Sequence, residues 1–148
     1  MAPVRANSQD REHQMTAIDT IDVTCELSQR FYFEAAHTLH RNIDTAGSLR
    51  IHGHTYEAEV TLSGIPDSTT GMLTDLGSLR QEIARVREML DHRFLDEIAG
   101  LGPATLENLC DFIRRQLQPA VPMLSAVAIE RRASGDKCVL RWNSLKSH

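Results

Sequence analysis

Three histidines have the spacing of a metal site. His52 and His54 are separated only by Gly53, and His37 lies fifteen residues before His52, at the end of the stretch "FYFEAAH". Side chains at positions i and i+2 of a strand point to the same face, so His52 and His54 would share one face, with room above Gly53. If the two segments pair as a hairpin, all three imidazoles can converge. Three neutral imidazoles suit Zn²⁺ and leave a fourth coordination position open, which is typical of catalytic zinc.

Two other interpretations of these histidines stay open at this point. An H-x-H pair also occurs without a metal. His40 competes as a ligand if residues 31–41 are helical, because His37 and His40 would then share a helix face. The alternation of apolar and polar residues along this segment favours a strand, and therefore the first interpretation.

Asp91 and His92 form a pair suited to proton transfer. An imidazole is the usual proton carrier near neutral pH, and an adjacent carboxylate orients it or raises its pKa. The pair also fits the exposed end of a helix, where a protonated imidazole interacts favourably with the helix dipole.

Glu130 is a carboxylate among small and apolar residues, at the same strand parity as Leu124. It is either an edge residue or a receptor for a ligand rich in donors, because a carboxylate can accept two hydrogen bonds from a planar N–H/NH₂ edge. Thr105 and Glu107 open a predicted helix, where capping accounts for them without a ligand.

The segments that carry the histidines have the period of strands. Odd positions of residues 23–37 are mainly apolar and even positions mainly polar, and residues 52–62 repeat this alternation until Gly64 and Pro66. We therefore expect two long, half-buried strands that place His37 beside His52 and His54.

Two amphipathic helices are expected next. Apolar residues recur at helical spacing over residues 76–90, with Asp75 or Thr74 as the N-cap. A second helix begins near Thr105 and stops at Pro119.

Two short strands, at residues 124–132 and 137–142, close the chain around a turn at Ser134-Gly135-Asp136. The order β-β-α-α-β-β predicts an α+β fold in which two helices cover one face of a four-stranded antiparallel sheet. The other face, or the sheet edges, would be buried by other copies of the chain.

The length of 148 residues suits a single domain, which we place at residues 21–148 behind a flexible N-terminal tail at residues 1–20. The formal net charge of −4 argues against a nucleic-acid partner. The basic pairs Arg85/Arg87 and Arg131/Arg132 are short and are expected to be solvated.

The three cysteines are few and widely spaced, which fits neither a disulfide framework nor a CxxC zinc motif. No apolar run approaches the roughly 20 residues of a membrane span, and the first twenty residues lack the apolar stretch of a signal peptide. A cytoplasmic protein without a membrane span is the simplest expectation. The cysteines are Cys25, Cys110 and Cys138.

Six motifs occur in one order along the chain: "FEAAH", "HGHTYEAEV", "GMLTDLGSLR", "LDHRFLDEI", "ATLENL" and "AIERR". Together, over residues 23–142, they resemble the family of 6-pyruvoyltetrahydropterin and 6-carboxytetrahydropterin synthases. The resemblance implies the tunnelling fold (T-fold), in which subunit sheets join into an oligomeric barrel. It also implies a homohexamer made of two trimers, with active sites between subunits.

The resemblance also assigns roles to the residues identified above. It implies zinc on the three histidines of "FEAAH" and "HGH", a pterin ring anchored by the glutamate of "AIERR", and proton transfer by the Asp-His pair of "LDH". The corresponding residues are His37, His52 and His54 for zinc, Glu130 for the ring with help from Thr105 and Glu107, and Asp91 with His92 for proton transfer.

The substrate that the resemblance implies is 7,8-dihydroneopterin triphosphate. In the bacterial branch of the family the product is 6-carboxy-5,6,7,8-tetrahydropterin, an early intermediate of queuosine. Two alternatives are an aldolase-like cleavage of the side chain of dihydroneopterin or its triphosphate, and a non-catalytic homologue that binds zinc or a pterin.

One position departs from the family pattern. The family carries a catalytic cysteine four residues before the first histidine of "HGH", where this chain has Ser48, and a variant branch has a glutamate where this chain has Leu49. A serine hydroxyl is far less acidic than a thiol and needs a neighbouring base or metal. Either His92 with Asp91 activates Ser48, or His92 is itself the base, or the chemistry is lost.

Overall fold

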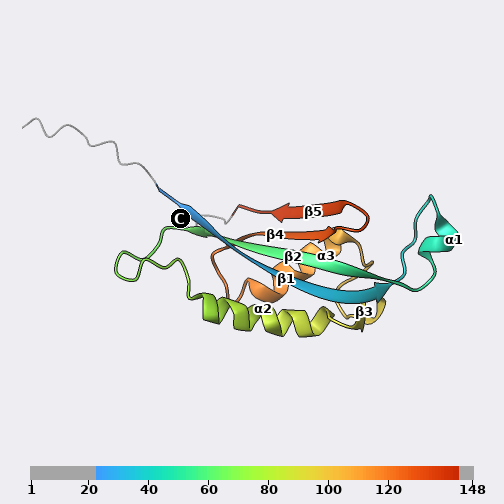
Figure 1. Ribbon diagram of the computed structural model, residues 1–148, viewed down its shortest axis with the longest axis horizontal. Coiled ribbons are helices and arrows are strands. Elements are labelled where there is room, and N and C mark those ends of the chain that lie inside the picture. The colour runs from blue at the N-terminus through green and yellow to red at the C-terminus, as the bar shows by residue number, and fades with distance from the viewer. Residues whose placement is uncertain (1–22, 144–148) are drawn as a thin grey trace, which may run out of the picture.

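Two paired strands of thirteen residues each form the centre of the molecule. The computed structural model describes residues 23–143. Strand β1 (Cys25–His37) runs antiparallel to β2 (His52–Gly64) in unbroken register from one end to the other. This confirms the two strands expected from the alternation, with β1 beginning two residues later than predicted. Figure 1 shows them as the longest arrows of the sheet.

The sheet continues beyond this pair on both sides. Strand β4 (Leu124–Arg131) pairs antiparallel with β2, and β5 (Asp136–Arg141) pairs antiparallel with β4. The strand order is β3-β1-β2-β4-β5. The β4–β5 turn places Gly135 at a φ of 73°, a left-handed conformation that glycine adopts without steric cost.

The expectation of four strands was wrong by one short strand. Strand β3 (Arg93–Phe94) has two residues and lies parallel to β1 beside Ala35 and Ala36. Two residues are too few to show an alternation, so the sequence carried no pattern from which to predict β3. The four longer strands are antiparallel as expected.

Helices α2 (Leu76–Leu90) and α3 (Leu106–Leu117) lie on the same face of the sheet, α2 against β1 and α3 against β4 and β5. Asp75 caps α2 by accepting hydrogen bonds from the backbone of its first turn. The core between helices and sheet is almost wholly aliphatic and aromatic; its largest fully buried side chains include Phe33, Tyr56, Leu62, Leu90, Leu109 and Phe112.

Two short helical turns lie near the histidines. The four-residue helix α1 (Thr45–Ser48) lies in the loop between β1 and β2, and the 3-10 turn η1 (Leu95–Glu97) follows β3. The sequence analysis predicted neither, since one turn of helix shows no period of its own.

A bulge in the pairing of β2 with β4 changes which face Glu130 occupies. The register shifts between Thr61 and Leu62, so Leu124 lies opposite Leu62 on the core face while Glu130 lies opposite Glu57 on the other face. Glu130 and Leu124 therefore lie on opposite faces although both occupy even positions. The shared face expected from their parity was wrong, because a bulge reverses the alternation along a strand.

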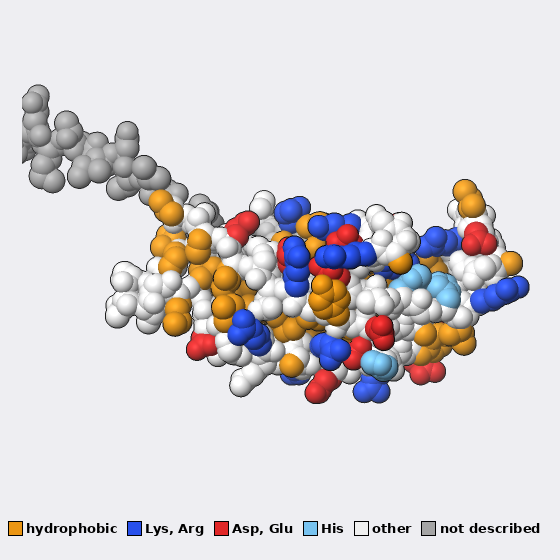
Figure 2. All heavy atoms as spheres, in the orientation of Figure 1, with side chains coloured by type: hydrophobic (Ala, Val, Ile, Leu, Met, Phe, Trp, Pro, Cys, Tyr) orange, Lys and Arg blue, Asp and Glu red, His pale blue; other side chains and the backbone are white. Residues whose placement is uncertain are grey.

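The face of the sheet away from the helices is polar. Figure 2 shows acidic and basic side chains intermixed over the central strands, with histidine near one end. Glu57 carries much of this charge pairing, with Arg132 Nε 2.7 Å and Arg30 Nε 3.7 Å from its carboxylate oxygens.

The predicted tail at residues 1–20 lies outside the described residues, as do residues 21–22 and 144–148 of the predicted domain. Within residues 23–143, no helix is both long enough and apolar enough to cross a membrane.

Candidate metal centre and active site

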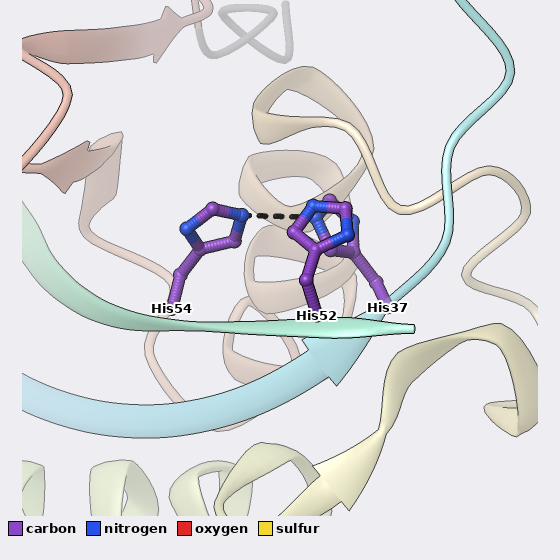
Figure 3. Close-up of side chains that lie close together, drawn as sticks. All are labelled: His37, His52 and His54. Carbon is purple, nitrogen blue, oxygen red and sulfur yellow. Dashed lines mark hydrogen bonds between the residues drawn. The ribbon is translucent and has the colours of Figure 1, made fainter. Parts of the chain in front are cut away.

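The register of β1 and β2 brings the three histidines together. His37 lies directly opposite His52, and His54 lies opposite Ala35, one pair further along. All three rings rise from the same side of the strands (Figure 3). Their centroids are 4.5 to 5.0 Å apart, and one ring nitrogen from each lies within 4.8 Å of the other two. The predicted convergence is confirmed.

Backbone carbonyls orient two of the rings. His37 Nδ1 lies 3.0 Å from the carbonyl oxygen of Ala104, and His52 Nδ1 lies 2.7 Å from that of Arg50. A carbonyl only accepts, so each Nδ1 carries the proton and each Nε2 presents a lone pair. Such a hydrogen bond on the far nitrogen is the usual way in which proteins orient a metal-binding histidine.

The third ring shows why a cation fits here. The Arg131 Nη1 atom lies 3.3 Å from His54 Nε2. A guanidinium only donates, so the tautomer of His54 that pairs with Arg131 carries its proton on Nδ1 and leaves Nε2 unprotonated. The Nε2 atoms of His37 and His54 are only 3.1 Å apart, the contact dashed in Figure 3. With a proton on His54 Nε2 this contact is a hydrogen bond to His37. In the tautomer that pairs with Arg131, both nitrogens are free of protons and close enough for one cation to bind both.

Burial keeps two of the three imidazoles, those of His37 and His54, neutral, as metal ligands must be. Desolvation, aided by the charge of Arg131, lowers the pKa of His54 to about 4. Desolvation and the neighbouring His52 also lower the pKa of His37, which is almost fully buried. Both residues are therefore ready to bind a metal at neutral pH without first losing a proton.

His40 is not part of this cluster. It is exposed and lies beyond the end of β1, and residues 31–37 are strand rather than helix. The alternative ligand set that used a helical His40 was therefore wrong.

Ser48 lies beside the histidines but not beside His92. It lines a hollow of about 260 Å³ together with His52 and His54, and its hydroxyl donates to the carbonyl of Thr45, 3.1 Å away. Among the described residues, no hydrogen bond joins Ser48 to His92. The possible triad of Ser48, His92 and Asp91 is thus not formed within one chain.

Asp91 and His92 form the expected pair at the end of α2. His92 Nδ1 lies 3.0 Å from Asp91 Oδ2, and the side chain of His92 is 77% exposed. Asp91 Oδ1 accepts from the backbone N–H of Glu34, which is the main reason that the pKa of Asp91 is lowered. His92 lines a hollow of about 560 Å³ together with Glu34 and Thr55. Its φ of 57° belongs to the left-handed region.

Glu130 is a half-buried carboxylate at a second hollow, of about 370 Å³, that it shares with Tyr32, Thr55 and Glu57. Its cross-strand neighbour Glu57 is already paired with arginines. Among residues 23–143, Glu130 makes no ion pair or side-chain hydrogen bond, so its oxygens are free to accept from a ligand.

Thr105 and Glu107 lie at the start of α3. Thr105 is the N-cap, and its hydroxyl accepts from the backbone N–H of Asn108, 3.2 Å away. The preceding residue, Ala104, supplies the carbonyl that holds His37. Glu107 is exposed in the first turn. The capping role is therefore seen directly for Thr105, and it ties the start of α3 to the histidine cluster.

Sequence analysis missed one residue of the site. Arg131 was expected to be solvated with Arg132, but its side chain is only 10% exposed and contacts His54. The sequence did contain an indication that Arg131 is buried. Arg131 follows Val127 and Ile129 at alternate positions, and all three lie on the buried face of β4. A basic residue at a position where the alternation of a strand calls for an apolar one indicates a buried, functional side chain.

The cysteines do not supply the missing thiol. Cys110 is buried in the core, where desolvation raises the pKa of its thiol to about 12. It lies beside Cys138 of β5, with its sulfur 3.7 Å from the Cys138 carbonyl. Cys25 lies at the opposite end of β1 from His37. None of them lines the hollows that contain the histidines.

The architecture and the cluster together define an α+β protein with a candidate metal centre at the ends of two paired strands. Residues 26–141 match the sequence profile of the family described as 6-pyruvoyl tetrahydropterin synthase. The chain therefore belongs to that family, as the six motifs had indicated.

Individual relatives agree with this assignment. A 6-pyruvoyl tetrahydrobiopterin synthase of Drosophila melanogaster is 36% identical over 110 residues, which cover 62% of this chain and 66% of that protein. A 6-carboxy-5,6,7,8-tetrahydropterin synthase of Synechocystis is 32% identical over 107 residues, which cover 68% of this chain and 81% of that protein.

The fold agrees as well. The solved structure of the Caenorhabditis elegans 6-pyruvoyl tetrahydropterin synthase has a TM-score of 0.70 and 27% identity, and the match covers 82% of this chain and 97% of that one. The mixed sheet with its helices thus matches the T-fold of this family.

Proposed function

We propose that this protein is a zinc-dependent lyase that acts on 7,8-dihydroneopterin triphosphate and forms 6-carboxy-5,6,7,8-tetrahydropterin, an intermediate of queuosine synthesis, in the cytoplasm. Membership of the family supports the substrate class. The Synechocystis relative carries the name of this reaction, whereas the Drosophila relative carries the name of a 6-pyruvoyl tetrahydrobiopterin synthase. The observation that carries the proposal is the convergence of the three imidazoles, which matches the ligand set of the family.

His37, His52 and His54 would hold the zinc ion. When bound, zinc would polarise the hydroxyl oxygens of the substrate side chain and lower the cost of removing a carbon-bound proton. The carbonyl groups of Ala104 and Arg50 keep two of these rings oriented for that task.

Glu130 would anchor the pterin ring. Its free carboxylate can accept two hydrogen bonds from the N–H/NH₂ edge of the ring. Glu57 cannot compete for that edge, because Arg132 and Arg30 already neutralise it. Thr105 and Glu107 are assigned a supporting role in ring binding on the strength of the family motif.

His92 would carry the proton, with Asp91 as its orienting partner. Asp91 is fixed by the backbone of Glu34 and by Arg87, so it holds Nδ1 of His92 and leaves Nε2 for proton transfer. This assignment makes His92 the base and Ser48 a hydrogen-bonding residue of the hollow, since among residues 23–143 the Ser48 hydroxyl donates to the Thr45 carbonyl and not to a histidine or carboxylate.

The family's hexamer of two trimers is part of this proposal. A polar sheet face without helices and an outer strand β5 of six residues are surfaces that other subunits could cover. Active sites would then form where His92 of one subunit approaches the histidine cluster of another.

Incubation of the zinc-loaded protein with 7,8-dihydroneopterin triphosphate, followed by mass analysis of the products, tests the proposal. A carboxytetrahydropterin product supports it. A hydroxymethylpterin would replace it by the aldolase-like reaction, and unchanged substrate that binds tightly would replace it by a binding role. The experiment tests both alternatives because Ser48 occupies the position of the family's usual thiol.

A Ser48→Cys variant should be compared with the natural chain in the same assay. If position 48 corresponds to the family's thiol, the variant should turn over the substrate faster, because a thiolate forms far more readily than an alkoxide near neutral pH. An unchanged rate would remove Ser48 from the list of reacting groups.

A further inference from the structure

Arg131 is a buried cation beside the histidine cluster. Its Nη2 atom is 2.7 Å from the Asp136 carboxylate, its Nη1 atom is 3.3 Å from His54 Nε2, and its Nε has no hydrogen-bond partner among residues 23–143. The next residue, Arg132, lies in a different environment: it is exposed, lies on the other side of the strand and pairs with Glu57.

Metal binding would leave Arg131 with a second unpaired donor. An imidazole nitrogen has one lone pair, so a metal ion on His54 Nε2 takes the acceptor that Nη1 now faces. Nη1 would then join Nε as a donor without a partner among residues 23–143, on a side chain that is only 10% exposed. Leaving donors of a largely buried side chain unsatisfied is costly. An acceptor that enters the hollow beside the histidines would satisfy it.

The charge at this position also favours an anion. Three neutral imidazoles do not offset a divalent cation, and the guanidinium adds a further positive charge. The charged side chains that line the hollow balance one another, because Asp44 and Asp136 lie there with Arg41 and Arg131. The charge of a metal ion would therefore remain uncompensated, and Asp136, the partner of Arg131, is 46% exposed and also accepts from Ser134. The hollow of about 260 Å³ between Arg131, His52 and Ser48 is large enough for a small oxyanion.

We propose that Arg131 is a substrate-binding residue that donates to an anionic oxygen of the substrate side chain held in this hollow. The proposal rests on the proposed metal site. It offers a reason why a chain without the usual thiol can still act, because a guanidinium within hydrogen-bond distance of a hydroxyl favours its deprotonated form. A weaker base then suffices.

The test uses the full-length protein loaded with Co²⁺, whose visible absorption reports on the atoms around the ion. Acetate serves as the probe anion and is titrated at constant ionic strength. Loss of a charge-assisted hydrogen bond should weaken acetate binding roughly tenfold to a hundredfold in Arg131→Met. Arg131→Lys should recover part of the affinity, since it keeps the charge but not the guanidinium fork. Arg132→Met, the matched control, should bind acetate as the natural chain does.

A second variant covers the case in which Arg131→Met fails to fold. Asp136→Asn keeps the guanidinium and removes its counter-charge, so acetate should bind more tightly if Arg131 faces the anion. Unchanged acetate affinity in Arg131→Met, or unchanged or weaker affinity in Asp136→Asn, would overturn the proposal. Failure of the natural chain to bind Co²⁺ through its histidines would overturn the metal site itself, and with it this inference, and is seen in the spectrum before acetate is added.

Discussion

The side chain of His52 is the clearest test of the metal centre. It is only half-buried, so its removal should leave the fold intact, and it faces the other two rings. We expect His52→Ala to lower zinc affinity by at least about a hundredfold, more than the loss that follows removal of a residue that only orients a ligand. Competition with a chelating dye measures this.

His40→Ala is the control for that measurement, because His40 is exposed outside the cluster. Equal zinc affinity in the two variants would show that His52 is not a ligand.

A substitution at Gly53 should affect substrate binding without affecting folding. A methyl group at this position would meet only the Ala35 carbonyl oxygen, at an ordinary 3.5 Å, yet it would project into the two hollows that contain His92 and Glu130. Gly53→Ala should therefore fold and bind zinc normally while KM for the pterin substrate rises several-fold. Steady-state kinetics with a zinc titration alongside measures both, and an unchanged KM would place the substrate elsewhere.

For single residues, type and spacing predicted the candidate metal ligands but not the side chains and carbonyl groups that contact them. Strand parity predicted that His37, His52 and His54 could converge if the two segments paired as a hairpin, and the resemblance to the family favoured this interpretation over the alternatives. Arg131 and the carbonyl of Ala104 were not predicted, because their positions depend on which strands and loops lie side by side in space. For Glu130 the sequence left two interpretations open, an edge residue or a receptor for a ligand, and the bulge in the pairing of β2 with β4 made its face of the sheet unpredictable.

The end of helix α2 is fastened to strand β1 through Asp91. Its carboxylate accepts from the backbone of Glu34 and pairs with Arg87, whose Nε in turn donates to the Tyr32 carbonyl. Asp91→Asn should lower the free energy of unfolding by about 1 kcal/mol at pH 7, because it removes the charge from these contacts. Urea denaturation of the two proteins measures the difference.

The effect of Asp91→Asn should depend on pH in one direction. Folding lowers the pKa of Asp91 below its ordinary value of 3.8, chiefly through the hydrogen bond from Glu34. The stabilisation is therefore complete above that value and is lost as the pH falls through the lowered, folded-state pKa. A stability difference that persists unchanged in strong acid would show that the carboxylate charge is not its cause.

Elements with a long period were predictable, and single turns were not. Strands β1 and β2 and helices α2 and α3 each repeat their pattern several times, so their positions were correct to within about two residues. The two-residue β3 pairs with β1 just after His92, whose backbone N–H donates to the Glu34 carbonyl. The four-residue α1 is held by a hydrogen bond from the backbone of Leu39, beyond the end of β1, to the Ser48 carbonyl. Those are tertiary contacts that no local pattern records.

The molecule as a whole has surfaces that suit assembly with further copies. The mixed charges of the uncovered sheet face and the unpaired edge of β5 both lie away from the helices. Light scattering coupled to size-exclusion chromatography should give a mass that is a multiple of three times the 16.6 kDa subunit, with six copies as the expected number. A stable monomer with full activity would contradict the assembly proposed from the family.

Mixed oligomers test whether one active site uses two chains. Within a chain, His92 shares one hollow with His54 of the histidine cluster, whereas His52 lines another hollow. The proposed hexamer would have each cluster use the His92 of a neighbouring subunit. His52→Ala should be inactive for lack of zinc, and His92→Ala for lack of its proton carrier. Dissociated together and reassembled, the two variants should form some sites with an intact cluster from one chain and an intact His92 from the other. Activity should then return in the mixture but not in either variant reassembled alone.

A mixture as inactive as its components, with the same oligomeric mass as the natural protein, would mean that each active site is built from a single chain and that His92 reaches the metal centre by a movement within it.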